Sequence, residues 1–180
     1  MDNPQAKSEE LAWLAGILDG EGSFLFLDNG HKGSYKGKNV VPVIYITNTC
    51  GEIIDYSVSI MTKIGFNPRV YTKQYRAKET WRPAFRIDVN KYSHMAMLIE
   101  AILPYLRSKG GQARLMMRFL KAREGRLHTR LDDECYAVLD EYFEIYAYRV
   151  HSKPQRLNAA PAYSGEDKVR PAVGNSAEGA

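Results

Sequence analysis

Two carboxylates stand two residues apart in a glycine-rich stretch, Asp19-Gly-Glu-Gly22, directly after a strongly apolar run. The run favours a helix, which would place both acids at its C-terminal end. There the helix dipole disfavours each negative charge by about 0.3–1 kcal/mol, so helix stability does not explain them. An isolated Asp-Gly-Glu-Gly is best interpreted as a solvated acid pair in a turn. The alternative is a set of oxygen ligands for a hard cation.

The helix that positions these acids is predicted from about residue 9 to residue 19. Ser8 is suited to cap it, and the two acids that follow suit the positive end of its dipole. Small residues recur every fourth position, so they share one face and allow a second backbone to come close. That face predicts a partner helix and consists of Ala12, Gly16 and Gly20.

The nine residues from Leu14 to Gly22, LAGILDGEG, resemble the LAGLIDADG motif of homing endonucleases, and Ser23-Phe24 follows as the expected strand entry. The resemblance implies an α+β fold with element order α-β-β-α-β-β-α, a saddle-shaped antiparallel sheet and extra C-terminal helices. It also implies that two motif helices pack at the centre of the protein. The last acid of the motif, here Glu21, would then bind the catalytic divalent metal.

The partner helix is expected to come from a second copy of the chain. We find no second motif and no room for another α-β-β-α-β-β unit, so the small-residue face predicts a homodimer. Its twofold axis would bring two Glu21 carboxylates together, and like charges repel unless cations neutralise them. We therefore expect Mg²⁺ or Mn²⁺, with the Gly20 carbonyl as a further ligand, and metal-assisted hydrolysis of a phosphodiester.

Two more catalytic side chains are implied by the resemblance. The segment Pro104-Tyr-Leu-Arg-Ser-Lys-Gly-Gly-Gln-Ala113 is similar to a family stretch whose lysine falls on Lys109, which would stabilise the transition state or activate water. The alternative is an ordinary lysine at the start of a helix. Family members place an amide at the end of the second strand to orient water, and this chain has the short Asn48 there. An arginine that some relatives carry just after that position is absent here.

Two predicted hairpins supply a surface for double-stranded DNA. The first joins strands at residues 23–28 and 40–47 through a basic connection, and the second joins strands at 68–75 and 81–89. Residues 69–91 contain seven cations and two anions, a bias unusual for a merely solvated face. We expect one four-stranded sheet in a major groove, with the strand joined through Gly22 at its centre. Residues expected at DNA are Ser23, Lys32, Lys36, Lys38, Arg69, Tyr71, Lys73, Tyr75, Arg82 and Arg86.

Further helices are predicted around the hairpins. A capping box at Thr49–Glu52 opens an amphipathic helix that ends at Gly65, and helices follow at about 91–103, 109–123 and 132–150. Ala137, Val138, Leu139, Tyr142, Ile145 and Tyr146 are expected on the buried side of the last helix. We assign residues 1–151 to one endonuclease domain and 152–180, rich in Ala, Pro, Gly and Ser, to a disordered tail.

Bulk composition limits the functional classes. With 180 residues, two cysteines and a net charge of +4, the chain suits one basic domain with reduced thiols. No signal peptide or membrane span is visible, so we expect an intracellular protein, in a prokaryotic cytoplasm or an organelle matrix, with no membrane partner and no small-molecule cofactor.

The sequence thus predicts a site-specific homing endonuclease that makes double-strand breaks with short 3′ overhangs and promotes mobility of its host intron. Strands of about eight residues would read about eight base pairs per subunit, giving a pseudo-palindromic target of roughly sixteen to twenty base pairs. The alternative is a non-catalytic nucleic-acid binder of the same fold, either an RNA-splicing maturase or a transcriptional regulator.

Overall fold

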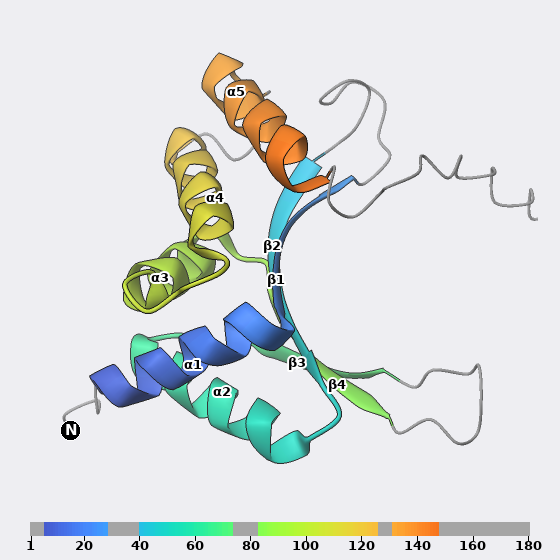
Figure 1. Ribbon diagram of the computed structural model, residues 1–180, viewed down its shortest axis with the longest axis vertical. Helices are drawn as coiled ribbons and strands as arrows, with labels where there is room; N and C mark the ends of the chain where they lie inside the picture. The colour runs from blue at the N-terminus through green and yellow to red at the C-terminus, as the bar shows by residue number, and fades with distance from the viewer. Residues whose placement is uncertain (1–5, 29–39, 74–82, 126–130, 148–180) are drawn as a thin grey trace, which may run out of the picture.

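A curved antiparallel sheet forms one layer of the molecule, and the helices form a second layer on a single side of it (Figure 1). The computed structural model describes residues 6–28, 40–73, 83–125 and 131–147. The predicted α+β class and element order are confirmed. In chain order the elements are α1 (Ser8–Glu21), β1 (Gly22–Asp28), β2 (Val40–Asn48), α2 (Gly51–Ile64), β3 (Arg69–Lys73), β4 (Ala84–Val89), α3 (Tyr92–Ile102), α4 (Gly110–Ala122), α5 (Asp133–Tyr142) and a π-helical turn, η1 (Phe143–Ala147).

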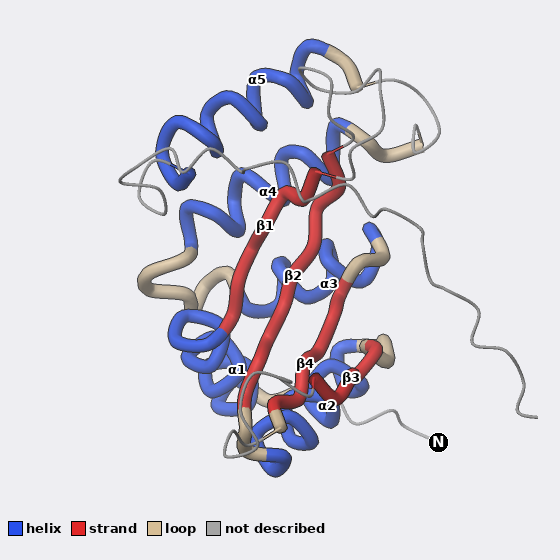
Figure 2. Tube along the Cα trace, turned by 90° about the vertical axis from the view of Figure 1, so that its right-hand side faces the viewer, coloured by secondary structure: helices blue, strands red, loops and turns tan. Residues whose placement is uncertain are grey.

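The strand order in the sheet is β1-β2-β4-β3, and all neighbouring strands are antiparallel (Figure 2). The prediction that the strand after Gly22 lies at the centre is wrong, because β1 is an edge strand. The central position suits β2, which is apolar on both faces, and β4, whose Ile87 is fully buried. Edge strand β3 leaves Val70 46% exposed.

Helix α1 begins at Ser8, with Lys7 in the capping position, so the expected Ser8 cap is wrong. The backbone N–H of Lys7 donates instead to Glu10 Oε2 at 2.9 Å, and Glu10 also pairs with Lys63 of α2. The helix runs two residues beyond its predicted end. Its inner side packs on α2, α3 and the sheet, through the buried Leu14, Ala15 and Leu18.

Helix α2 packs on strands β2 and β4, with Ile54, Ser57, Ile60 and Met61 buried as predicted. The predicted capping box is wrong. Cys50 occupies the cap position, and the Asn48 side chain accepts its backbone N–H at 2.8 Å. The helix ends at Gly65 as expected, and the φ of +121° there is a conformation that side chains with a Cβ rarely adopt.

Helices α4 and α5 cover the far end of β1. Phe26 lies edge-on to Phe119 and Tyr142, with ring centroids 5.0 and 4.8 Å apart, and the Tyr142 hydroxyl donates to the Phe24 carbonyl at 2.6 Å. Burial, and secondarily Tyr146, raises the pKa of Tyr142 to about 12.

The last predicted helix is divided, because the α-helix ends at Tyr142 and continues as the π-helical turn. That change of helical repeat shifts later side chains around the axis, so the predicted burial of Ile145 is wrong. The predicted burial of Ala137 is also wrong, because Ala137 lies on the exposed side of α5. Val138, Leu139 and Tyr142 are buried as expected. The domain boundary at residue 151 and the tail lie outside the described residues, within which no helix is long and apolar enough to cross a bilayer.

Candidate functional site

The acid pair at the end of α1 is split between two environments. Glu21 is exposed and has no hydrogen bond or ion pair to any described residue. The chain turns directly from helix to strand at Gly22, where an added Cβ would lie 2.7 Å from the Leu18 carbonyl oxygen. Glycine is therefore required at this close turn, which fixes Glu21 at the junction of α1 and the sheet.

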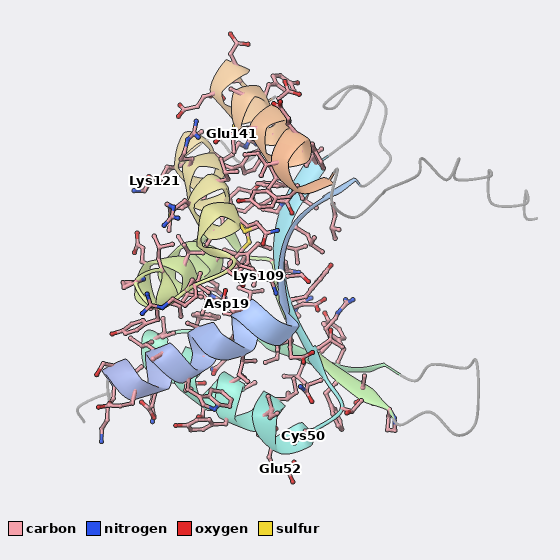
Figure 3. All side chains as sticks on the ribbon, viewed as in Figure 1. Asp19, Cys50, Glu52, Lys109, Lys121 and Glu141 are labelled. Carbon is pink, nitrogen blue, oxygen red and sulfur yellow. The ribbon has the colours of Figure 1, made fainter. Side chains whose placement is uncertain are left out.

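Asp19 binds the turn that leads into α4 (Figure 3). Its carboxylate accepts the backbone N–H groups of Arg107, Ser108 and Lys109 at 2.7, 3.2 and 2.9 Å, and the Ser108 hydroxyl at 3.0 Å. Burial opposes its ionisation, but these hydrogen bonds hold the pKa of Asp19 below its ordinary value. The conclusion that stability does not explain the acids is therefore wrong for Asp19, because the turn it binds is remote in sequence.

Lys109, the last residue of the turn that Asp19 binds, forms hydrogen bonds back to the end of α1. Its ammonium donates to the carbonyl of Leu18 in the last turn of α1 at 2.9 Å, and to that of Gly22, which caps the helix and begins β1, at 2.6 Å. Burial lowers the pKa of Lys109, while the nearby charges of Asp19 and Glu21 act to raise it. Lys109 thus lies beside both acids, and two of its three N–H donors are used.

The exchange of charges complements two helix dipoles at once. Helix α4 has no acid in its first turn and α1 has no base in its last turn, so each lacks the charge that would stabilise its end. Asp19 supplies the anion at the start of α4, and Lys109 supplies the cation at the end of α1. We call this arrangement, Asp19 with the 107–109 turn and Lys109 with the α1 carbonyls, the α1–α4 clamp.

The protomer has too few free oxygen ligands in its described residues to hold a hard divalent ion by itself. The described residues contain no group of three His, Cys, Asp or Glu side chains that could hold a metal. Asp19 is engaged in the clamp, which leaves the Glu21 carboxylate and the Gly20 carbonyl. Such oxygens fit Mg²⁺ or Mn²⁺, and a second protomer and a phosphate would have to complete the coordination.

Asn48 ends β2, as the sequence indicated, but part of its amide is already engaged. Its Oδ1 accepts the Cys50 N–H at 2.8 Å, which orders the turn into α2. The side-chain NH₂ group carries no hydrogen bond to a described residue. Asn48 therefore has a structural contact that sequence reasoning missed, and it retains donors for a further one.

None of the described residues covers the small-residue face of α1. Ala12, Gly16 and Gly20 are all exposed. A Cβ added at either glycine would meet nothing within 4 Å. Contacts within the described protomer therefore do not explain why these positions are small.

The face of the sheet opposite the helices is turned toward the viewer in Figure 2. Register places Ser23, Tyr45, Asp88 and Arg69 in one row across the four strands, and Thr47, Arg86 and Tyr71 in the next. Arg69 and Tyr71 are exposed. The backbone of Lys73 lies opposite Ala84 of β4. Outside the described residues lie Lys32, Lys36, Lys38, Tyr75 and Arg82.

Arg86 is held within this face by groups that the sequence-based list omitted. Its guanidinium forms an ion pair with Asp88, with Nε 2.5 Å from Oδ1, and Nη2 donates to Oδ2 at 2.7 Å. The guanidinium carbon lies 4.3 Å from the centre of the Tyr45 ring. The hydrogen bond to Asp88 raises the pKa of Arg86. Their separation by two strand positions was the available signal, since such residues share a face.

Comparison with known proteins gives a likeness in structure alone. No protein-family model and no curated protein sequence matches the chain. The archaeal intron-encoded homing endonuclease I-Vdi141I, complexed with DNA, matches with a TM-score of 0.55 and 17% identity over 74% of this chain and 84% of that chain. The homing endonuclease I-TnaI matches with a TM-score of 0.53 and 18% identity over 78% and 88%.

A third neighbour differs in length. The LAGLIDADG meganuclease I-CpaMI, bound to uncleaved DNA, matches with a TM-score of 0.53 and 16% identity, and the match covers 76% of this chain but 50% of that one. These likenesses confirm the expected fold: the chain has the LAGLIDADG fold of homing endonucleases.

Proposed function

We propose that this protein is a divalent-metal-dependent, site-specific DNA endonuclease that acts as a homodimer. The observation that carries the proposal is the exposed, unpaired Glu21 at the end of an uncovered small-residue helix face, in a fold shared with homing endonucleases. The nuclease assignment rests on that acid and its surroundings, because fold alone does not fix function.

The homodimer is supported by the cost of exposed glycines. Glycine inside a helix is less favourable than alanine by about 1 kcal/mol, and neither Gly16 nor Gly20 meets a contact from the described residues that would compensate. A second α1 packed on Ala12, Gly16 and Gly20 supplies the reason for their size. The length relation to I-CpaMI, of which this chain covers half, fits two copies of this chain acting together.

In the dimer each protomer contributes a Glu21 carboxylate and a Gly20 carbonyl beside the twofold axis. Bound Mg²⁺ or Mn²⁺ would supply Lewis-acid activation of a phosphodiester and neutralise the two carboxylates. Lys109, fixed by the clamp, has one N–H donor left, which would donate to the phosphate and offset developing negative charge. Asn48 uses its free NH₂ group to hold water.

The sheet provides the DNA-binding surface of the proposal. Strand β2 has nine residues, about 30 Å at roughly 3.3 Å per residue, which suits a major groove over about eight or nine base pairs. Twofold symmetry then requires a pseudo-palindromic target of roughly sixteen to twenty base pairs. Cleavage leaves short 3′ overhangs, and the biological role is mobility of the host intron.

A cleavage selection tests the nuclease. The protein is incubated with a randomised plasmid library and Mg²⁺, and cut molecules are recovered and sequenced. We expect a discrete target that is cut with Mg²⁺ and left intact with EDTA. The variant Glu21→Gln should bind that target with unchanged affinity and fail to cut it. Cutting by Glu21→Gln would remove Glu21 from the metal site, and sequence-specific binding without cutting by the wild type would favour a maturase or regulator instead.

A further inference from the structure

Arg86 occupies the middle of the sheet face opposite the helices, with its orientation already fixed. It lies on central strand β4, opposite Thr47 of β2 and Tyr71 of β3. Asp88 engages one edge of its guanidinium, through Nε and Nη2. The Arg86 side chain is 21% exposed and that of Asp88 is 11% exposed, so solvent reaches the arginine more than the acid that holds it.

Two tyrosines restrict the guanidinium further. Its central carbon lies 4.3 Å from the ring centre of Tyr45 and 6.0 Å from that of Tyr71. Tyr71 is 41% exposed and stands at the edge strand, whereas Tyr45 is half-buried on the central strand β2. A planar cation held between an acid and an aromatic face loses much of the freedom that a surface arginine has, which lowers the entropy cost of a specific contact.

The donors that remain define the ligand. A guanidinium has five N–H groups. Asp88 accepts one hydrogen of Nη2 and lies against Nε, whose buried N–H has no hydrogen-bond partner among the described residues. Both hydrogens of Nη1 and the second of Nη2 carry no bond to a described residue. One complete two-donor edge is therefore available. In a major groove, guanine is the base that presents two adjacent acceptors, O6 and N7, to such an edge.

We propose that Arg86 reads a guanine in each half of the target, and that Asp88 is a specificity-determining residue because it positions Arg86 for that contact. The inference rests on the proposed DNA binding but is independent of cleavage. A phosphate contact is the competing use of an arginine, and the ion pair argues against it. Asp88 neutralises the charge on which phosphate binding and counterion release depend. Arg69, exposed on edge strand β3, is better placed for phosphate.

The test is a binding measurement, made in Ca²⁺ or without metal so that cutting plays no part. A target is first selected by binding from a random duplex library. Affinities are then measured for every single-base substitution of that target, at several salt concentrations. The variants are Arg86→Ala, Arg86→Lys, Asp88→Asn and, as a matched exposed control, Arg69→Ala. Circular dichroism checks that each variant is folded. If Arg86→Ala does not fold, the conservative variants Arg86→Lys and Asp88→Asn still test the inference.

Wild type should lose about 5- to 150-fold in affinity when the guanine at one symmetric pair of positions is replaced. Arg86→Ala and Arg86→Lys should abolish that preference at the same positions, since lysine keeps the charge without the two-donor edge. Asp88→Asn should weaken the preference there and nowhere else. Arg86→Ala should leave the salt dependence of binding unchanged, whereas Arg69→Ala should reduce the slope by about one per protomer.

Several outcomes would overturn the inference. A salt slope that falls for Arg86→Ala as it does for Arg69→Ala, with every base preference intact, would make Arg86 a phosphate binder. Unchanged preferences in Asp88→Asn would remove the role of Asp88. Specific binding of a target that stays uncut when Mg²⁺ is added would leave this inference standing and contradict the nuclease proposal alone. Failure of the wild type to select any DNA sequence would overturn both.

Discussion

The substitution Asp19→Asn should destabilise the protein, although the proposed mechanism gives Asp19 no contact with metal or DNA. Its carboxylate accepts three backbone N–H groups and one hydroxyl at the start of α4. The amide keeps one oxygen acceptor and loses the negative charge, worth about 0.3–1 kcal/mol at a helix N-terminus. Adding the charge-assisted part of the hydrogen bonds, reduced because solvent reaches the site, gives a loss of about 1–2 kcal/mol in the free energy of unfolding.

Urea unfolding at several pH values measures this loss. The pKa of Asp19 is lower in the folded protein than its unfolded value of about 3.9, so the contribution of the carboxylate is complete above that pH. It disappears as the pH falls through the folded pKa. Wild type and Asp19→Asn should therefore differ at pH 7 and converge in strong acid.

Glu21→Gln is the matched control for Asp19→Asn. It makes the same chemical change two residues away, at an exposed carboxylate without a described partner, and should leave stability unchanged or slightly raised. Equal stability of Asp19→Asn and wild type at pH 7, or a difference that persists in strong acid, would refute the clamp.

Two other predictions concern the site and its support. Because the charge of Glu21 raises the pKa of Lys109 against the effect of burial, Glu21→Gln should move that pKa further below its ordinary value. An NMR titration of the Lys109 Cε signal measures it, and an unchanged titration would mean that the two side chains are not close. Tyr142→Phe removes the hydroxyl that the Phe24 carbonyl accepts and should cost about 1–2 kcal/mol in urea unfolding. An unchanged unfolding midpoint would show that this hydrogen bond contributes nothing net.

Local sequence signals were enough for the elements and for the motif. Hydrophobic periodicity located α2 and its buried residues, and alternation located the second hairpin. Short apolar runs bounded by a Gly- and Lys-rich connection located the first hairpin, and the nine-residue motif identified the fold. The strand order was missed because a hairpin fixes its own pairing but leaves open which of its strands meets the next hairpin. That choice depends on burial summed over both faces of β2, which periodicity along one strand does not measure.

The errors in the site arise from contacts between distant segments. Asp19 and the 107–109 turn are about ninety positions apart, so the sequence presented an unexplained acid and a lysine with two interpretations. In the structure Lys109 binds carbonyls at the end of α1, which holds its ammonium beside Glu21. That position favours the catalytic interpretation of Lys109 over an ordinary lysine at the start of a helix. The Arg86–Asp88 pair was readable from its spacing, but its closeness to Tyr45 follows from the register between β2 and β4.

The most direct test of the central claim is the mass of the protein in solution and on its selected duplex, measured by sedimentation for wild type and Gly16→Leu. A Cβ at position 16 meets no described residue within 4 Å, so the variant should fold at least as stably as wild type. It should block close approach of a second α1. We predict two chains per complex for the wild type, and single chains without cleavage for the variant. A lone wild-type protomer that cuts its duplex, or an unaltered dimer of Gly16→Leu, would contradict assembly through α1.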